Sequence, residues 1–372
     1  MLEIFAASIV RKNRGRGNQF MTQTMIGLVK AERKPGAVLQ EVPIPAYGPH
    51  DVLIRVQASS ICGTDVHIYK WDDWAARTVV TPNVFGHEFA GVVTSVGSEV
   101  TNVKPGDYVS GEGHVVCGMC KACRTGNAHV CANTRSFGIT IPGCFAEYAV
   151  VRDSNVIHND PKLLPHIACL QDPLGNAVQA ALSGDIVGKS VAVIGVGPIG
   201  LMAIAVAKAC GSGTVIAVDV NSYRLDMAKA MGADVIINSA EEPLVDTLMQ
   251  HTGGEGAEVV LEMSGHPGAI RDALKAAAQA ARVSLLGIPT EEVPFDLARD
   301  IIFKGLHIEG ITGRRMFDTW YQIKGLLNRG RLNLEPLVTH HFRLDQYEEA
   351  FELMASGKCG KIVFSHDLNR AM

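Results

Sequence analysis

The feature that most constrains the fold of this chain is an apolar run that leads directly into a glycine-rich turn. Residues 190–194 read Ser-Val-Ala-Val-Ile, which is typical of a parallel strand buried on both faces. Gly195-Val196-Gly197-Pro198-Ile199-Gly200 follows, and a helical pattern covers residues 201–210. A G-x-G-x-x-G turn between a strand and a helix is the signature of dinucleotide binding.

Each glycine of this turn has a physical role in such a site. Gly195 permits the tight turn, Gly197 lets a pyrophosphate approach the backbone, and Gly200 allows the helix to pack closely on the strand. Asp219 lies nineteen residues after Gly200 and would accept hydrogen bonds from a ribose hydroxyl. Its charge would repel a 2′-phosphate, so the pattern favours NAD over NADP, although Arg224 offers a partner for such a phosphate. The alternative is a glycine turn that binds no ligand.

The chain around this turn shows two kinds of pattern. Strand-like runs separated by helical patterns predict a doubly wound parallel sheet of the Rossmann type; they recur at 214–219, 235–238, 258–262, 282–287 and 307–310. Residues 24–160 instead contain short strand candidates divided by turns, which is typical of a small irregular barrel. Residues 360–364 form a last apolar run, which we expect to return to the barrel and make that domain discontinuous.

These patterns give a division of the chain. We expect a catalytic barrel domain at 25–175 and 318–372, a nucleotide-binding domain at 176–317, and a disordered extension at 1–24. Residues 2–10 are mostly apolar and positive charges follow them, which reverses the order of a secretory signal peptide. A mitochondrial-type presequence, or a start codon assigned too early with Met21 or Met25 as the true start, are the alternatives for this extension.

Four cysteines lie close together in the sequence and predict a structural zinc lobe. Their spacing, C-x2-C-x2-C-x7-C, supplies four thiolates, which fill a tetrahedral zinc ion completely; they are Cys117, Cys120, Cys123 and Cys131. An iron–sulfur cluster and a nucleic-acid-binding zinc module are alternatives. Lys121 and Arg124 alone make a poor basic face for nucleic acid, which argues against the second of these.

A second set of metal-binding side chains predicts a catalytic zinc ion. Cys62, His87 and Glu88 offer sulfur, nitrogen and oxygen, and a catalytic zinc needs only three protein ligands because one position stays open for substrate. His87 and Glu88 are adjacent, so both reach one ion only where the backbone turns, which Gly86 allows. Thr64 and His67 follow Cys62 and are able to move protons. The alternative for Cys62 and His67 is an ordinary place in the core.

Composition excludes several other classes of protein. The formal net charge of −4 gives no basic surface for nucleic acid, and no apolar run is long enough to cross a membrane. A chain of 372 residues is long enough to fold without disulfide bonds. We therefore expect its nine cysteines to be reduced thiols in a cytoplasmic protein.

Together these motifs resemble the zinc-dependent medium-chain alcohol dehydrogenase superfamily. The Gly-His-Glu sequence at 86–88, the four cysteines and the glycine-rich turn occur in its order, and the resemblance covers about residue 25 to the C-terminus. Finer features resemble the L-threonine 3-dehydrogenases within it, namely the segments at 61–69, 172–177, 261–265 and 313–320. Thr312 and Arg315 depart from the pattern of these enzymes, and the N-terminal extension has no counterpart in it.

The resemblance implies a GroES-like catalytic domain, two zinc ions per subunit, NAD as cofactor and a homotetramer. It implies that Cys62, His87 and Glu88 bind the catalytic zinc and that Thr64 and His67 relay a proton. It also places Asp172 at the zinc, either as a ligand or polarising a bound water. The positions that contact NAD in such enzymes, beyond the three glycines, are Ile199, Asp219, Arg224, Leu286, Gly287, Ile288, Ile311 and Thr312.

The function expected from the resemblance is oxidation of the β-hydroxyl of L-threonine to 2-amino-3-oxobutanoate, a step of threonine degradation. His114 precedes the cysteine lobe, and we expect it to contact the charged end of the substrate, with a structural role as the alternative. A polyol or 2,3-butanediol dehydrogenase is the nearest alternative function. A non-enzymatic NAD-binding protein is the alternative from another class.

Overall fold

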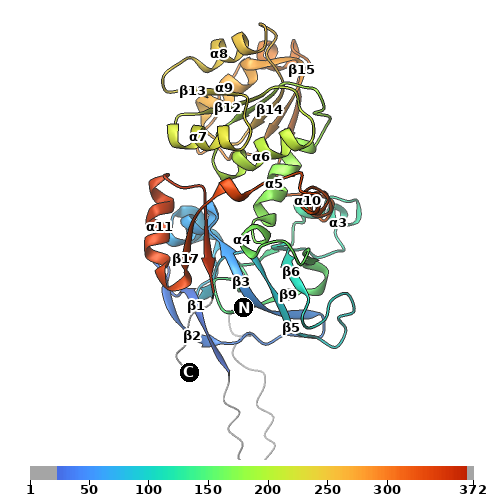
Figure 1. The fold of residues 1–372 in the computed structure, drawn as a ribbon, viewed down its shortest axis with the longest axis vertical. Coiled ribbons are helices and arrows are strands. Elements are labelled where there is room, and N and C mark those ends of the chain that lie inside the picture. The colour runs from blue at the N-terminus through green and yellow to red at the C-terminus, as the bar shows by residue number, and fades with distance from the viewer. Residues whose placement is uncertain (1–22, 367–372) are drawn as a thin grey trace, which may run out of the picture.

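A computed structural model describes residues 23–366 of the chain. Its lower part in Figure 1 is a β-rich body and its upper part is a parallel sheet covered by helices, with helix α5 (Gln171–Leu182) between them. The predicted fold class is confirmed. The predicted extension at 1–24 lies almost wholly outside the described residues, and the first strand begins at Thr24. None of the helices described is both long and apolar enough to span a bilayer.

The upper part contains six parallel strands in the order β13-β12-β11-β14-β15-β16. Val191 and Val193 of β11 pack into one apolar cluster, and Ala192 and Ile194 pack into another on the opposite face. Both faces of this strand are therefore buried, which explains its continuous apolar run. The strands are β11 (Val191–Ile194), β12 (Val215–Asp219), β13 (Val235–Asn238), β14 (Ala257–Glu262), β15 (Ala277–Leu285) and β16 (His307–Gly310).

Helices cover both faces of this sheet (Figure 1). The predicted helix at 201–210 begins three residues earlier, because Pro198 is tolerated in the first turn, where its missing N–H has no intrahelical partner. Strand β15 also begins five residues before the predicted start. Its first residues are mostly alanines, which favour a helix, and the pairing of Ala277 with Ala257 of β14 starts the strand before an irregularity that ends at Arg282. The helices are α6 (Pro198–Ala209), α7 (Ser222–Ala230), α8 (Leu244–His251) and α9 (Pro267–Ala276).

The lower part is built on a seven-stranded sheet, of which six strands run in the order β10-β6-β5-β3-β18-β17, while β9 pairs with β3. Three further strands form a second sheet in the order β2-β1-β4. The strands are β1 (Thr24–Lys30), β2 (Val38–Pro43), β3 (Asp51–Ser60), β4 (Asn83–Val84), β5 (Glu88–Val96), β6 (Tyr108–Gly111), β9 (Tyr148–Arg152), β10 (Val156–His158), β17 (Val338–Arg343) and β18 (Lys361–Ser365).

The C-terminal segment returns to this lower part. Strand β18 pairs antiparallel with β3, so the last described strand lies beside the strand that leads to Cys62. In Figure 1 the red α11 and β17 accordingly lie next to the blue β3. The exact boundaries 25–175, 176–317 and 318–372 stay a prediction. The remaining helices are α1 (Gly63–Lys70), α2 (Asp73–Thr78), α3 (Lys121–Arg124), α4 (Pro165–Ala168), α10 (Asp318–Asn328) and α11 (Tyr347–Ser356).

Candidate active site

Cys62 is held at the N-terminus of α1, directly after the end of β3. Its backbone N–H donates to the Asp65 Oδ2 at 2.8 Å, which satisfies one of the free amides at the start of a helix. The Thr64 Oγ1 lies 3.7 Å from the Cys62 Sγ on the same helix turn. Helix capping by Asp65 therefore fixes the position of both the thiol and the hydroxyl.

His87 and Glu88 reach the same place as Cys62 because the backbone turns at Gly86. Gly86 has φ +87°, and a Cβ at this position would lie 2.4 Å from the Phe145 ring, so only glycine fits. Strand β5 begins at Glu88, three residues before the predicted start at Gly91. His87 therefore lies in the turn, and Glu88 is the first residue of the strand.

These three side chains fit a zinc ion. One ligand atom from each of Cys62, His87 and Glu88 lies within 4.8 Å of the other two. The buried Glu88 Oε1 has no hydrogen-bond partner among the described residues, which is costly unless a cation satisfies such an atom. The Asp65 Oδ1 lies 3.6 Å from the His87 Nδ1, the arrangement in which a carboxylate orients a metal-binding imidazole.

The other oxygen of Glu88 is anchored from the C-terminal end of the chain. The Glu88 Oε2 accepts hydrogen bonds from the Ser60 hydroxyl and from the buried Lys361 ammonium of β18. Lys361 also donates to the Ile61 carbonyl at 2.9 Å. Burial by itself would lower the pKa of Lys361, but the Glu88 carboxylate outweighs it and raises the pKa, so Lys361 stays charged.

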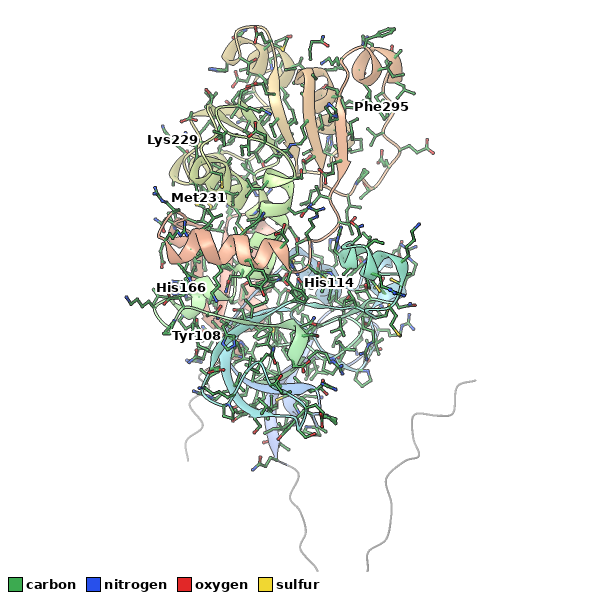
Figure 2. All side chains as sticks on the ribbon, turned by 90° about the vertical axis from the view of Figure 1, so that its right-hand side faces the viewer. Tyr108, His114, His166, Lys229, Met231 and Phe295 are labelled. Atoms are coloured by element: carbon green, nitrogen blue, oxygen red, sulfur yellow. The ribbon has the colours of Figure 1, made fainter. Side chains whose placement is uncertain are left out.

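A cavity of about 150 Å³ opens beside these ligands, and its lining includes Cys62, Thr64, His87, Glu88, His114, Asp172 and Ile199. Figure 2 shows His114 at the junction of the two parts of the molecule. His67 is not among the residues that line the cavity. Its side chain is 59% exposed, and its Nδ1 hydrogen-bonds with the carboxylate of Asp72, which caps α2.

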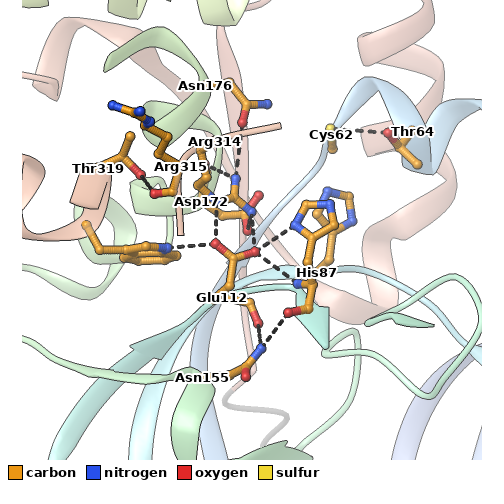
Figure 3. Close-up of polar contacts among 12 residues, drawn as sticks. Cys62, Thr64, His87, Glu112, Asn155, Asp172, Asn176, Arg314, Arg315 and Thr319 are labelled. Carbon is orange, nitrogen blue, oxygen red and sulfur yellow. Dashed lines mark hydrogen bonds and ion pairs between the residues drawn. The ribbon is translucent and has the colours of Figure 1, made fainter. Parts of the chain in front are cut away.

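Asp172 lies at the cavity but belongs to a buried ion-pair network and not to the three-ligand group. Its carboxylate pairs with Arg314, whose guanidinium also pairs with Glu112 at 2.7 Å. Trp320 donates from its indole N–H to Glu112 at 2.8 Å. Figure 3 shows these contacts converging on the Glu112 carboxylate. The predicted direct binding of zinc by Asp172 stays a prediction.

The four predicted cysteines of the lobe come together between two short strands, β7 (His114–Val115) and β8 (Arg135–Ser136). One sulfur from each lies within 4.8 Å of the others, as a tetrahedral zinc site requires. Backbone N–H groups of Met119 and Cys120 stabilise the Cys117 thiolate and lower the pKa of this thiol to about 6. The donor set therefore fits a fully coordinated metal ion.

The predicted dinucleotide site is a cavity of about 610 Å³ at the carboxyl ends of the parallel strands. The predicted residues that line it are Gly195, Gly197, Asp219 and Arg224. A Cβ at Gly200 would lie 2.2 Å from the Gly195 carbonyl oxygen, so the turn closes only with glycine there. The Asp219 carboxylate accepts backbone hydrogen bonds from Val196 and Asn221, and its remaining lone pairs are free to accept from a ribose. These residues fit NAD.

Comparison with known proteins places the chain in a family. The family model for the alcohol dehydrogenase GroES-like domain matches residues 48–162, and the model for zinc-binding dehydrogenases matches residues 198–329. L-Threonine 3-dehydrogenases from Symbiobacterium thermophilum and Bacillus licheniformis are 52% and 51% identical to the chain, over 94% and 92% of it and 99% of each relative. The one from Pyrococcus abyssi is 50% identical over 92% of the chain and 99% of the relative.

The chain belongs to the L-threonine 3-dehydrogenase family.

Solved structures of more distant dehydrogenases share its fold. An alcohol dehydrogenase from Thermus sp. ATN1 superimposes with a TM-score of 0.85 at 32% identity, over 92% of this chain and 99% of that one. A protein described as a short chain alcohol dehydrogenase from Escherichia coli CFT073, in complex with NADH, has a TM-score of 0.85 at 28% identity and the same coverage. These likenesses confirm the fold of an oxidoreductase, and the second of these proteins was solved with NADH bound.

Several residues predicted to contact NAD do not line the 610 Å³ cavity of the dinucleotide site. Ile199 lines the smaller cavity instead. Gly287 packs against Gly265, and a Cβ there would lie 2.7 Å from the Glu262 Oε2, which places the 286–288 segment beside the wall formed by Met263 and Ser264. The predicted contacts of Leu286, Gly287, Ile288, Ile311 and Thr312 with NAD stay predictions.

Sequence reasoning missed the residues that hold the site together. Asp65, Glu112, Arg314 and Lys361 are all buried and charged, and each contacts a predicted site residue. Asp65 and Arg314 lay within segments that resemble the family, 61–69 and 313–320, and that was the only signal available for them. Glu112 and Lys361 lie in no such segment, and their charged partners are distant in sequence.

Proposed function

We propose that this chain catalyses the NAD-dependent oxidation of L-threonine to 2-amino-3-oxobutanoate, with release of one proton per NADH formed. One observation carries the proposal. Ile199 of the glycine-rich turn lines the same cavity as Cys62, His87 and Glu88, so the dinucleotide site and the candidate zinc site open onto one space. A hydride is transferred only between groups in contact, and this shared cavity provides that contact.

Two bound groups supply the chemistry that side chains lack. When bound, zinc lowers the pKa of a substrate hydroxyl and NAD⁺ accepts the hydride. The residues that would hold the ion are Cys62, His87 and Glu88, and those that would hold the cofactor are Gly195, Gly197, Ile199, Gly200, Asp219 and Arg224.

Thr64 and His67 provide a route for the proton of the substrate hydroxyl. The Thr64 hydroxyl lies at the cavity and His67 lies one helical turn further along α1, at the surface. Although burial opposes it, hydrogen bonds from Ala75 and His67 lower the pKa of Asp72, so the Asp72 carboxylate is ionised and accepts from the His67 Nδ1–H. The His67 Nε2 is then the nitrogen that receives the proton.

The charged ends of threonine require partners that a simple alcohol does not. His114 and Asp172 line the cavity and are polar side chains available to these charged ends. We expect the His114→Ala change to raise KM for L-threonine far more than KM for 2-butanol, a secondary alcohol without either charge. Equal effects on both alcohols would assign His114 a structural role.

The activity is tested by following NADH absorbance with L-threonine, 2,3-butanediol and sorbitol as substrates. We expect kcat/KM to be highest for L-threonine and to be higher with NAD⁺ than with NADP⁺. A higher kcat/KM for 2,3-butanediol or sorbitol would show that the enzyme carries out the same reaction on a different substrate. No alcohol-dependent NADH formation, with both zinc ions present, would favour a non-enzymatic NAD-binding protein.

The proposal includes two zinc ions per subunit, a homotetramer and a cytoplasmic location. All nine cysteines are free thiols, which supports a reducing compartment.

Strand β16 is the last strand on one side of the parallel sheet, and exposed apolar side chains near it include Phe295, Phe303 and Ile308, which supports association with other copies. Figure 2 shows Phe295 far from His114. Sedimentation equilibrium would give the mass of four chains.

A further inference from the structure

The Glu112 carboxylate is the most heavily hydrogen-bonded group beside the active site. It is 1% exposed, and it lies at the end of β6, directly before the turn that leads to His114. Five N–H groups converge on its two oxygens (Figure 3). They are the Arg314 Nε–H at 2.7 Å, the Arg314 Nη2–H at 3.1 Å, the Trp320 indole N–H at 2.8 Å, the His114 Nδ1–H at 2.7 Å and the His114 backbone N–H at 2.9 Å.

These contacts keep the carboxylate ionised. Burial by itself would raise the pKa of Glu112, but the charge of Arg314 and the hydrogen bonds from His114 and Arg314 outweigh it and lower the pKa far below its ordinary value. An ionised carboxylate only accepts hydrogen bonds. The His114 Nδ1 therefore carries the hydrogen, and the ring has a single orientation.

Arg314 is fully occupied and therefore does not bind substrate itself. Its Nε–H and one Nη2–H donate to Glu112, and the other Nη2–H donates to the Asp172 carboxylate. Its two Nη1–H groups have the Asp172 carbonyl and the Asn176 amide oxygen as acceptors. All five donors of the guanidinium thus have an acceptor within the protein. Arg314 acts through the two carboxylates it holds.

His114 presents its other nitrogen to the cavity. Both its ring Nδ1 and its backbone N–H donate to the same oxygen of Glu112, while Asn155 donates to the carbonyls of Glu112 and His114. The backbone and the ring are both fixed. A Cβ at Gly313 would lie 3.6 Å from the His114 Cε1, so this glycine leaves the cavity side of the ring uncovered.

We propose that Glu112 is a positioning residue for substrate selection, which fixes His114 so that its Nε2 meets the charged end of an amino-acid substrate. The inference rests on the proposed function. Arg314 and Trp320 follow the last strand of the parallel sheet, so the segment 313–320 brings two of the three residues that hold Glu112 from positions 202 and 208 residues further along the chain.

A double-mutant cycle tests this assignment. Glu112→Gln keeps the size of the side chain but replaces one acceptor oxygen by a donor. The readout is the ratio of kcat/KM for L-threonine to kcat/KM for 2-butanol. Because hydrogen bonds to a charged group are stronger than those between neutral groups, we expect the ratio to fall roughly tenfold or more in Glu112→Gln, mainly through KM for threonine.

The cycle is completed in the His114→Ala background. There, Glu112→Gln should change the ratio no further, because a positioning residue has no effect once the group it positions is gone. Asp300→Asn serves as the control, since Asp300 is also a buried carboxylate paired with an arginine but lies outside the cavity. This control should leave the ratio unchanged.

Other outcomes overturn the inference in distinguishable ways. If His114→Ala lowers the ratio and a folded Glu112→Gln does not, Glu112 does not position the substrate and the proposed function stands. If the fold-change of the ratio in the double variant equals the product of the fold-changes in the two single variants, Glu112 acts independently of His114. If Glu112→Gln fails to fold, Trp320→Phe removes only one of the five donors and should lower the ratio in the same direction; an unchanged ratio rejects the inference. If the unmodified enzyme does not oxidise threonine, the proposed function fails first.

Discussion

At the scale of single residues, the side chains that do chemistry were predictable and their supports were not. Cys62, His87 and Glu88 are ordinary zinc-binding types, and Gly86 indicated the turn that lets two adjacent side chains meet. Lys361 gave no comparable signal. It lies 273 residues from Glu88, and only the pairing of β18 with β3 brings its ammonium to the site.

Replacing Lys361 should loosen the metal site. In Lys361→Met the buried Glu88 carboxylate loses its only cationic side-chain partner among the described residues, and breaking a buried ion pair costs about 3–5 kcal/mol. We expect a lower melting temperature and weaker zinc binding, measured by competition with a chromophoric chelator. Lys358→Met, at an exposed position, is the matched control. Equal zinc affinity in both variants would show that Lys361 does not support the ligand.

Acid stability should depend on Glu112. Its pKa is lowered on folding, so the unfolded chain takes up a proton that the folded protein does not. The stability that Glu112 contributes is therefore fully present above its ordinary pKa of 4.5 and is lost as pH falls below that value. Between about pH 4.5 and 3.5, the unfolding free energy of Glu112→Gln should decline less steeply than that of the unmodified protein, by up to about 1.4 kcal/mol per pH unit. Urea titrations at several pH values measure this, and identical slopes would contradict it.

At the scale of elements, the pattern of the glycine-rich turn predicted β11, the turn and α6, because Gly195 with its positive φ and Gly200 beside the Gly195 carbonyl are required by the turn itself. The start of β15 was not predictable in the same way. Its alanines favour a helix on their own, and among them only Ala277 pairs with β14, before an irregularity that ends at Arg282. Elements specified by local contacts could thus be predicted, while those specified by distant pairing could not.

Closing the nucleotide turn should require Gly200. In Gly200→Ala the new Cβ would lie 2.2 Å from the Gly195 carbonyl oxygen, so the turn must open. We expect the dissociation constant for NADH, measured by fluorescence, to rise at least tenfold. Gly325→Ala is the control, because a Cβ there meets nothing within 4 Å and alanine favours the α10 helix. An unaltered NADH affinity in Gly200→Ala would argue against dinucleotide binding at this turn.

The cysteine lobe should stabilise the folded protein without taking part in catalysis. Cys120→Ser removes one of four thiolates and should reduce bound zinc from two ions to one per subunit, with a lower melting temperature. We expect the remaining zinc at Cys62 to keep kcat within about threefold at temperatures where the protein is folded. Cys210→Ser, a thiol outside both metal groups, should change neither property. Complete loss of activity in a folded Cys120→Ser protein would assign the lobe a catalytic role.

At the scale of the whole molecule, the active site forms where the two parts of the chain meet. The zinc ligands come from β3, β5 and the segments beside them, Ile199 comes from the nucleotide turn, and Arg314 comes from the segment after the last parallel strand. The sequence predicted both parts and the return of residues 360–364. It did not predict which side chains bridge them, because a buried pair such as Arg314 and Glu112, 202 residues apart, follows only from the assembled fold.

Stepwise restoration of zinc tests the account most directly. The enzyme is first stripped of metal by a chelator, and zinc is then added in known equivalents while L-threonine-dependent NADH formation is recorded. We predict no activity without zinc, full recovery by two equivalents per subunit, and no recovery in Cys62→Ser even though that variant still binds one zinc ion. Threonine oxidation by the metal-free protein, or by zinc-loaded Cys62→Ser at the unmodified rate, would contradict the assignment of Cys62, His87 and Glu88 as the catalytic metal site.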